Sequence, residues 1–230
     1  MKDFLKNRQH SRSEGLIVDL NERLFYYLGK ISLFTLLRRN RKIKDMHNFV
    51  DSWVISNILL SIIMSYLIVK FINNKVILSL AFFYAFLRVF EIIVYQINVN
   101  LFDRYRSKLR NKDYRIKSPT RTVILLLYNY IEIIFWYVIM IVAILKLSNC
   151  KDISRYKYYI ESSFLCLTTL NYELVASMAK SQYQVLSSIA ILEVVSGLVM
   201  TIISLANFIG KLPSEYRKEF NKKITKKRNS

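Results

Sequence analysis

The stretch from Tyr158 to Gly210, YYIESSFLCLTTLNYELVASMAKSQYQVLSSIAILEVVSGLVMTIISLANFIG, decides the fold of this chain. Its first apolar run, Phe164 to Leu170, is far shorter than the roughly 20 residues that a membrane-crossing helix needs. A small polar turn follows, and a full-length hydrophobic span comes after it. This order is typical of a loop that enters a membrane, returns to the same side and is followed by a lining helix.

The composition of the whole chain indicates an integral membrane protein. The 230 residues are 53% hydrophobic and still carry a formal net charge of +19. The apolar residues form blocks of about 20, separated by short basic connectors, as expected when hydrocarbon surrounds the blocks. The chain has only 4 Gly and 2 Pro, too few for the many turns that a β-barrel needs. The remaining structure that satisfies its own backbone in lipid is the α-helix, so we expect an all-α membrane protein.

Three further apolar blocks precede the opening stretch. Trp53 to Ile72 and Val76 to Val99 are separated by three residues and predict a tight helical hairpin. Thr122 to Leu147 predicts a third span after a basic connector. Within that connector, Pro119 is expected to end any helix that continues from the second span.

The distribution of basic residues predicts the orientation in the membrane. Met1 to Asp51, Asn100 to Arg121 and Lys211 to Ser230 hold 11, 8 and 8 Lys and Arg. The connectors on the other side hold only Lys75, Lys151, Arg155, Lys157 and Lys180. The positive-inside rule therefore places both termini in the cytoplasm, which requires an even number of spans. Four transmembrane helices, with a re-entrant pore helix and loop between the third and fourth, meet that requirement.

The residues before the first span predict an amphipathic helix from Leu16 to Leu37. Its apolar stripe consists of Ile17, Leu20, Leu24, Leu28, Ile31 and Thr35. The basic run Arg38 to Lys44 follows directly. One interpretation is a helix lying on the anionic surface of the cytoplasmic leaflet. The other is a helix that packs on a neighbouring subunit or a protein partner.

Three ionisable residues fall inside the predicted spans. Arg88 and Glu91 lie three residues apart on one face of the second span, and Glu132 lies in the third. Charges at this depth are costly, so we expect the three side chains to face inward and pair. Such a network ordinarily fixes helix register. A proton relay or voltage sensor is the functional alternative, although voltage sensors repeat Arg every third residue.

The opening stretch resembles the pore module of tetrameric potassium channels, whose filter commonly contains T-x-G-Y-G. Thr169, Leu170 and Tyr172 match the filter, and Gly197 matches the hinge glycine of the inner helix, Gln184 to Gly210. The resemblance covers Thr122 to Gly210, and the preceding hairpin resembles the extra helices of bacterial four-span members. It implies a homotetramer in the inner membrane of a bacterial cell, a gate at Gly197, and a pore formed by Thr168, Thr169, Leu170, Asn171, Tyr172 and Glu173. A chance amphipathic hairpin is the ordinary alternative.

Three departures from the family pattern lie in the filter itself. Asn171 and Glu173 replace the two glycines, and Leu174 replaces the aspartate. A potassium filter needs extended strands of alternating handedness, and a non-glycine residue held in a strained conformation costs about 1–3 kcal/mol. A potassium-selective filter is therefore not expected. Four Glu173 carboxylates could form a cation-attracting ring, or each could pair with Lys180 and close the mouth.

No pattern in the sequence predicts an enzyme or a cofactor. His10 and His47 lie in basic segments away from any metal-ligand spacing, and Cys150 and Cys166 are too few for a metal cluster. The sequence thus leaves two hypotheses. The first is a homotetrameric cation channel of relaxed selectivity. The second is a non-conducting, channel-derived scaffold or sensor that recruits a cytoplasmic protein, for example in a stress response or in phage defence.

The partners expected from the sequence follow from its basic segments. The tail, Lys211 to Ser230, is best interpreted as a solvated helix that extends the fourth span. Anionic lipids are the next candidate for the basic segments, and a cytoplasmic protein comes third. No nucleic-acid partner is expected, because basic connectors beside membrane spans already have an explanation.

Overall fold

The computed structural model describes residues 15–32, 46–109, 119–150 and 155–228, and in these ranges every regular element is a helix. The long helices are α2 (Leu16–Ile31), α4 (Met46–Lys70), α5 (Lys75–Ile97), α7 (Pro119–Leu147), α8 (Tyr156–Thr169) and α10 (Tyr183–Arg228). Shorter elements are a π-helix, η2 (Asn98–Phe102), then α6 (Asp103–Leu109), α9 (Glu173–Ala176) and the 3₁₀ helix η3 (Lys180–Gln182). Their order agrees with the predicted all-α class.

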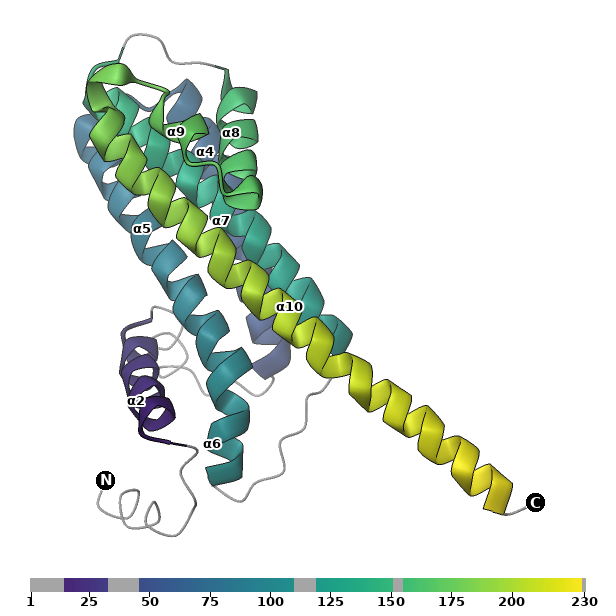
Figure 1. Ribbon diagram of the computed structural model, residues 1–230. Helices are drawn as coiled ribbons and strands as arrows, with labels where there is room; N and C mark the ends of the chain where they lie inside the picture. Colours follow the sequence, from purple (N-terminus) through teal and green to yellow (C-terminus); the bar gives the residue numbers. More distant parts are fainter. Residues whose placement is uncertain (1–14, 33–45, 110–118, 151–154, 229–230) are drawn as a thin grey trace.

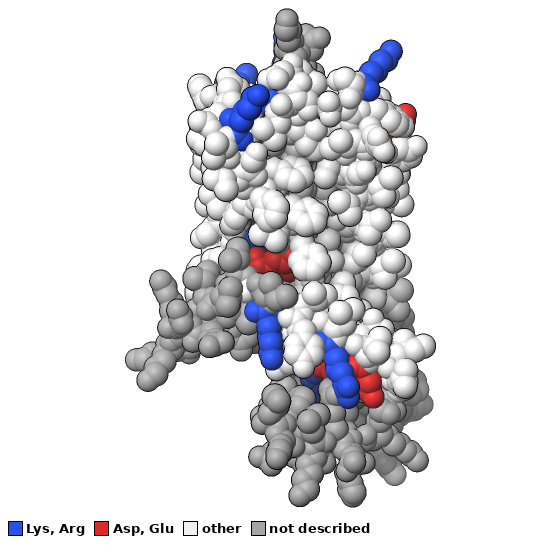
Figure 2. Space-filling view, turned by 90° about the vertical axis from the view of Figure 1, so that its left-hand side faces the viewer, with Lys and Arg blue, Asp and Glu red and all other residues white. Residues whose placement is uncertain are grey.

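Four segments are long and apolar enough to cross a membrane, as the sequence predicts. They are Asn48–Lys70, Lys75–Phe102, Arg121–Leu147 and Lys180–Ala206. Figure 1 shows the helices α4, α5, α7 and α10 running alongside one another in one bundle. Charged side chains on the face drawn in Figure 2 gather near the two ends, and the belt between them is uncharged apart from one acidic patch. The chain therefore has the build of a multi-pass membrane protein.

Helix α7 forms the centre of the bundle. The most apolar part of its span is 78% buried, against 33–39% for the other three spans. Every residue from Glu132 to Leu145 is buried except Phe135, which is half-buried. Its neighbours are α4, α5, α8 and α10. The small buried residues Ser61 and Ser65 of α4 contribute to close helix packing.

Side chains satisfy unpaired backbone groups at the end of α4 and at the start of α5. Asn74 caps α5 by accepting the backbone N–H groups of Val76 and Ile77. At the same end of the bundle, the Lys146 ammonium donates to the Ile68 and Ile72 carbonyls, where α4 ends. A cation is favourable there because a helix C-terminus carries partial negative charge.

The predicted role of Pro119 as a helix end stays a prediction. Helix α6 is described as far as Leu109, residues 110–118 lie outside the described ranges, and Pro119 is the first described residue of α7. Proline is well tolerated in the first turn of a helix, because the N–H group that it lacks would have no intrahelical partner there.

Some predicted features lie outside the described residues. These are the segment Met1 to Glu14, the basic run Arg38 to Lys44 and the middle of the connector, residues 110–118. The amphipathic helix is described as α2, from Leu16 to Ile31. Helix α10 continues through the predicted tail to Arg228, and its side chains are described as far as Ala206.

Candidate functional site

The turn predicted to form a pore lies between α8 and α9 and is exposed on the single chain. Thr168 and Thr169 form the last turn of α8, and their hydroxyls donate to the carbonyls of Phe164 and Leu165, one turn back. Leu170 then adopts the left-handed conformation, with φ 59° and ψ 25°, and ends the helix. Left-handed backbone is common directly after a helix, although a non-glycine residue there is less common.

The two residues that replace filter glycines are not strained in the described backbone. Its positive-φ residues other than glycine are Asn149 and Leu170, so Asn171 and Glu173 avoid that region. The Asn171 side chain accepts the Glu173 N–H at 3.2 Å, which stabilises the turn. Glu173 then begins the helical turn α9. The backbone here is a turn between two helices rather than an extended strand.

The exposed Glu173 carboxylate is held by an aromatic hydroxyl. Tyr183, the first residue of α10, donates its hydroxyl to Glu173 Oε2 at 3.0 Å. Among the ion pairs of the described residues, none joins Glu173 to Lys180. Within one chain a neutral donor therefore places the exposed carboxylate near the start of α10.

Gly197 lies where α8 meets α10. A Cβ atom at this position would sit 2.3 Å from the backbone oxygen of Leu167, far inside van der Waals contact. The end of α8 can approach α10 this closely only because residue 197 has no side chain. Helix α10 continues past Gly197 without interruption. The structure thus gives this glycine a packing role, and its role as a gate stays a prediction.

The structure brings Arg88, Glu91 and Glu132 together inside the bundle. Arg88 Nη1 donates to Glu91 Oε2 at 2.7 Å, and Arg88 Nε donates to Glu132 Oε1 at 2.8 Å. The Trp136 indole N–H donates to the same Glu132 oxygen at 2.9 Å. All three charged side chains are buried. The guanidinium fork joins α5 to α7, and removing either partner would leave a buried charge uncompensated.

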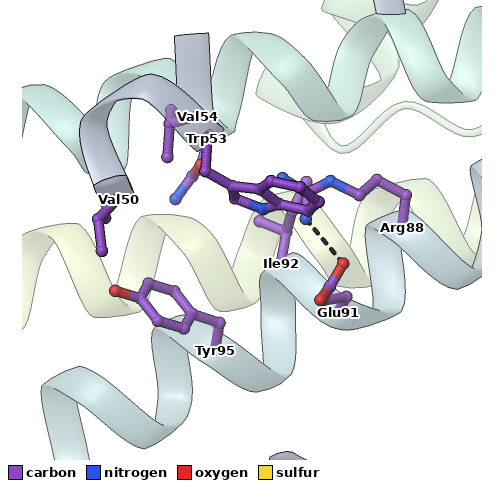
Figure 3. A pocket seen from close by; sticks show the side chains of 8 residues that line it. Val50, Trp53, Val54, Arg88, Glu91, Ile92 and Tyr95 are labelled. Carbon is purple, nitrogen blue, oxygen red and sulfur yellow. Dashed lines mark hydrogen bonds and ion pairs between the residues drawn. The ribbon is translucent and has the colours of Figure 1, made fainter. Parts of the chain in front are cut away.

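A small cavity of about 30 Å³ adjoins this network, with room for a water molecule. Figure 3 shows the Trp53 ring against Arg88, with Glu91 and Tyr95 on the α5 side. The Arg88 guanidinium carbon lies 5.5 Å from the centre of the Trp53 ring, within cation–π range. Trp53, the first residue of the first predicted span, is thus part of the wall of the charge network. Ser32, directly after α2, also hydrogen-bonds to Glu91.

A second buried carboxyl group was missed as a site by the sequence analysis. Glu193 of α10 is completely buried, and it hydrogen-bonds to Ser163 of α8. Its Oε2 atom has no hydrogen-bond partner among the described residues. The Ser163 hydroxyl also has the Ile134 carbonyl of α7 within 3.2 Å. The signal was available, because an acidic residue inside an apolar span ordinarily faces the protein interior.

In the ranges that the structure describes, no three His, Cys, Asp or Glu side chains lie close enough together to hold a metal ion. The candidate functional sites are the exposed turn at the end of α8 and the buried carboxyl groups of Glu91, Glu132 and Glu193. No family model, curated protein or solved structure matches this chain.

Proposed function

We propose that this chain is one subunit of a homotetrameric, channel-like membrane protein that conducts cations with relaxed selectivity. The observation that carries the proposal is the depth of the exposed polar turn after α8. Leu167 contacts Gly197, which lies 14 residues after Tyr183, or about 21 Å along α10. This depth falls inside the fourth apolar span, Lys180–Ala206.

Polar groups at such a depth need a polar environment. Thr168, Thr169 and Asn171 are exposed on the single chain. Irregular backbone facing hydrocarbon is not stable; it is tolerated where it is buried in protein or lines a water-filled cavity. Neighbouring copies around a shared aqueous path would provide both. In this proposal α8 is the re-entrant pore helix, and α10 is the inner helix.

The electrostatics of the turn favour cations. The last carbonyls of α8 lack intrahelical partners and carry the partial negative charge of a helix C-terminus. The exposed Glu173 side chain adds an acidic group nearer the start of α10. Four copies would place four such groups around one axis, which is how charged rings favour cations in non-selective pores.

The local backbone supports relaxed rather than potassium-specific conduction. Potassium selectivity depends on successive carbonyls along an extended strand. In this chain Leu170 is left-handed, Asn171 closes a turn with its side chain, and Glu173 starts a helix. Glu173 and the residues around it would therefore act through side-chain charge more than through a carbonyl ladder.

Ion conduction can be tested by recording from purified tetramers in planar bilayers. We expect cation current, and we expect Glu173→Gln to weaken the preference for cations over anions. Glu161→Gln is the matched control, because Glu161 is an exposed acidic residue of α8 that pairs with Lys157 away from the turn. Stable tetramers that carry no current at any pH or voltage would contradict the proposal.

A second function is favoured by a different feature, the far end of α10. This helix continues 22 residues past Ala206 to Arg228 and extends away from the bundle in Figure 1. A projecting helix of basic sequence is suited to hold a cytoplasmic protein, so the alternative is a non-conducting scaffold, for example in phage defence. A soluble partner that copurifies with the full chain, but not with a chain truncated after Ala206, would support it in the absence of current.

A further inference from the structure

Helix α2 is attached to the bundle through its polar side. Arg106 Nε donates to Glu22 at 2.9 Å, and the Tyr105 hydroxyl donates to Asp19. Asn98 Nδ2 donates to the Phe25 carbonyl at 2.8 Å, across the gap left by Gly29. Glu22 is only 4% exposed. This face of α2 therefore packs against η2 and α6 through an ion pair and hydrogen bonds.

The opposite side of α2 is apolar and uncovered. At 100° per residue, the exposed apolar side chains cluster on the face directly across the helix from Glu22. They are Leu16, Ile17, Leu20, Leu24 and Tyr27, with exposures from 50% to 81%. A helix on a water-soluble protein buries such a stripe. Here the polar face is inside and the apolar face outside, which is the arrangement of a helix in lipid.

The contacts also define how α2 is oriented. From its N-terminal to its C-terminal end, Asp19, Phe25 and Ser32 meet residues that come progressively earlier in the chain. These partners are Tyr105, Asn98 and Glu91, so α2 runs antiparallel to the end of α5, η2 and α6 over about 20 Å. Figure 1 shows α2 beside these elements. A helix lying flat on a membrane surface would not follow a span in this way.

The depth of α2 follows from the bounds of the second span. That span extends to Phe102, and Phe25 stacks on Phe102 with ring centres 5.7 Å apart. Residues 25–31 of α2 thus lie beside the end of the span, and Leu24 and Leu20, one and five residues before Phe25, lie within about 8 Å of that end. An open groove of about 420 Å³ between α2 and this segment is lined mainly by apolar side chains, among them Ile17, Ile97 and Leu101.

We infer that α2 is embedded in one leaflet at the boundary between headgroups and acyl chains, with its exposed apolar face and the adjoining groove covered by the acyl chains. Helix α2 enters the lipid at the end of the bundle that the distribution of basic residues predicts to be cytoplasmic. The flanking sequence complements anionic headgroups: Lys2, Lys6, Arg8 and Arg12 precede α2, and the run Arg38 to Lys44 follows it. These charges favour a lipid surface over a second copy of this equally basic chain.

The inference can be tested with photo-crosslinking in the full-length protein. A benzophenone amino acid is placed at Leu20 or Leu24, and the protein is reconstituted in vesicles of phosphatidylethanolamine and phosphatidylglycerol. Illumination should give phospholipid adducts, detected by mass spectrometry. Leu59, an exposed residue within the first span, is the positive control for lipid contact. Phe25, which stacks on Phe102, is the position on the docked side of α2 that should react within the chain.

Each other outcome overturns the inference. Crosslinked dimers from Leu20 and Leu24 would show that a second copy covers the stripe. Absence of lipid adducts at both positions, with adducts at Leu59, would place the face in water. Because the readout is lipid contact and not current, the result is independent of whether the protein conducts ions.

Discussion

The two buried acidic centres of this bundle are constructed differently. Glu91 and Glu132 share the Arg88 guanidinium, and the Trp136 indole adds a further donor. Glu193 is equally buried but has the Ser163 hydroxyl as its hydrogen-bond partner, and one oxygen has none among the described residues. The first centre joins two spans by charge, whereas the second joins α8 to α10 by a neutral contact. The contact between α5 and α7 thus depends on ion pairs, whereas the contact between α8 and α10 in the candidate pore region depends on a hydrogen bond from a hydroxyl group.

The largest effect is expected from breaking the charged centre. Arg88→Leu leaves two carboxylates buried without their cation, and losing one partner of a buried ion pair costs about 3–5 kcal/mol. We expect a large fall in the midpoint of thermal unfolding in detergent. Lys70→Leu is the control, because Lys70 is exposed at the end of α4. An unchanged midpoint for Arg88→Leu would show that the network does not stabilise the bundle.

A Glu→Gln substitution at each acidic centre should change the free energy of unfolding by different amounts. Glu132→Gln weakens the charge-assisted bonds to Arg88 and should lower the free energy of unfolding by about 1.5–3 kcal/mol. Glu193→Gln should change it by less than about 1 kcal/mol. A glutamine amide can donate to Ser163, which frees the Ser163 hydroxyl to donate to the Ile134 carbonyl. Chemical unfolding of both variants measures the two changes, and equal losses would remove the distinction between the centres.

A smaller effect is expected where α8 rests on α10. Gly197→Ala places a methyl group 2.3 Å from the Leu167 carbonyl oxygen, so the end of α8 must move away. Overpacking of this kind costs about 1–3 kcal/mol. The shift should appear as faster amide hydrogen exchange in residues 164–176, with the α4–α5 hairpin unaffected. Exchange that rises equally throughout the bundle would argue against a local contact.

The smallest expected difference concerns the two cysteines. Cys166 is completely buried beside α10, whereas Cys150 is half-buried. A maleimide must reach a thiolate to react, so Cys166 should be labelled more slowly than Cys150. Mass spectrometry of the protein at mildly alkaline pH measures both rates. Faster labelling of Cys166 would indicate that the α8–α10 contact opens readily.

Long-range hydropathy made the spans and the first charge centre predictable. Lipid requires blocks of a minimum length, so four spans follow from the apolar runs alone. The pairing of Arg88, Glu91 and Glu132 could be predicted because charged side chains inside spans face the protein interior and pair with one another. Glu193 obeys the same rule, but its partner Ser163 lies on a helix whose depth is set by the Gly197 contact. That contact joins residues 30 positions apart and leaves no periodic signal.

The orientation of α2 was not predictable for a similar reason. Periodicity identifies its apolar stripe but does not say which face meets the protein. The answer depends on Asn98, Tyr105 and Arg106, more than 70 residues away along the chain. The strain expected at Asn171 and Glu173 depended on the extended geometry of a filter, and the described turn avoids it.

The length of α10 has a mechanical consequence. The helix runs unbroken for 31 residues from the Gly197 contact to Arg228, about 46 Å at 1.5 Å per residue. A tilt of about 5° at Gly197 therefore displaces its far end by about 4 Å. If α10 bends at Gly197, as the predicted gate requires, the Leu167 carbonyl would be the pivot of a lever arm. A small change in the position of α8 would then be converted into a displacement that a protein or lipid bound at the other end of α10 would experience.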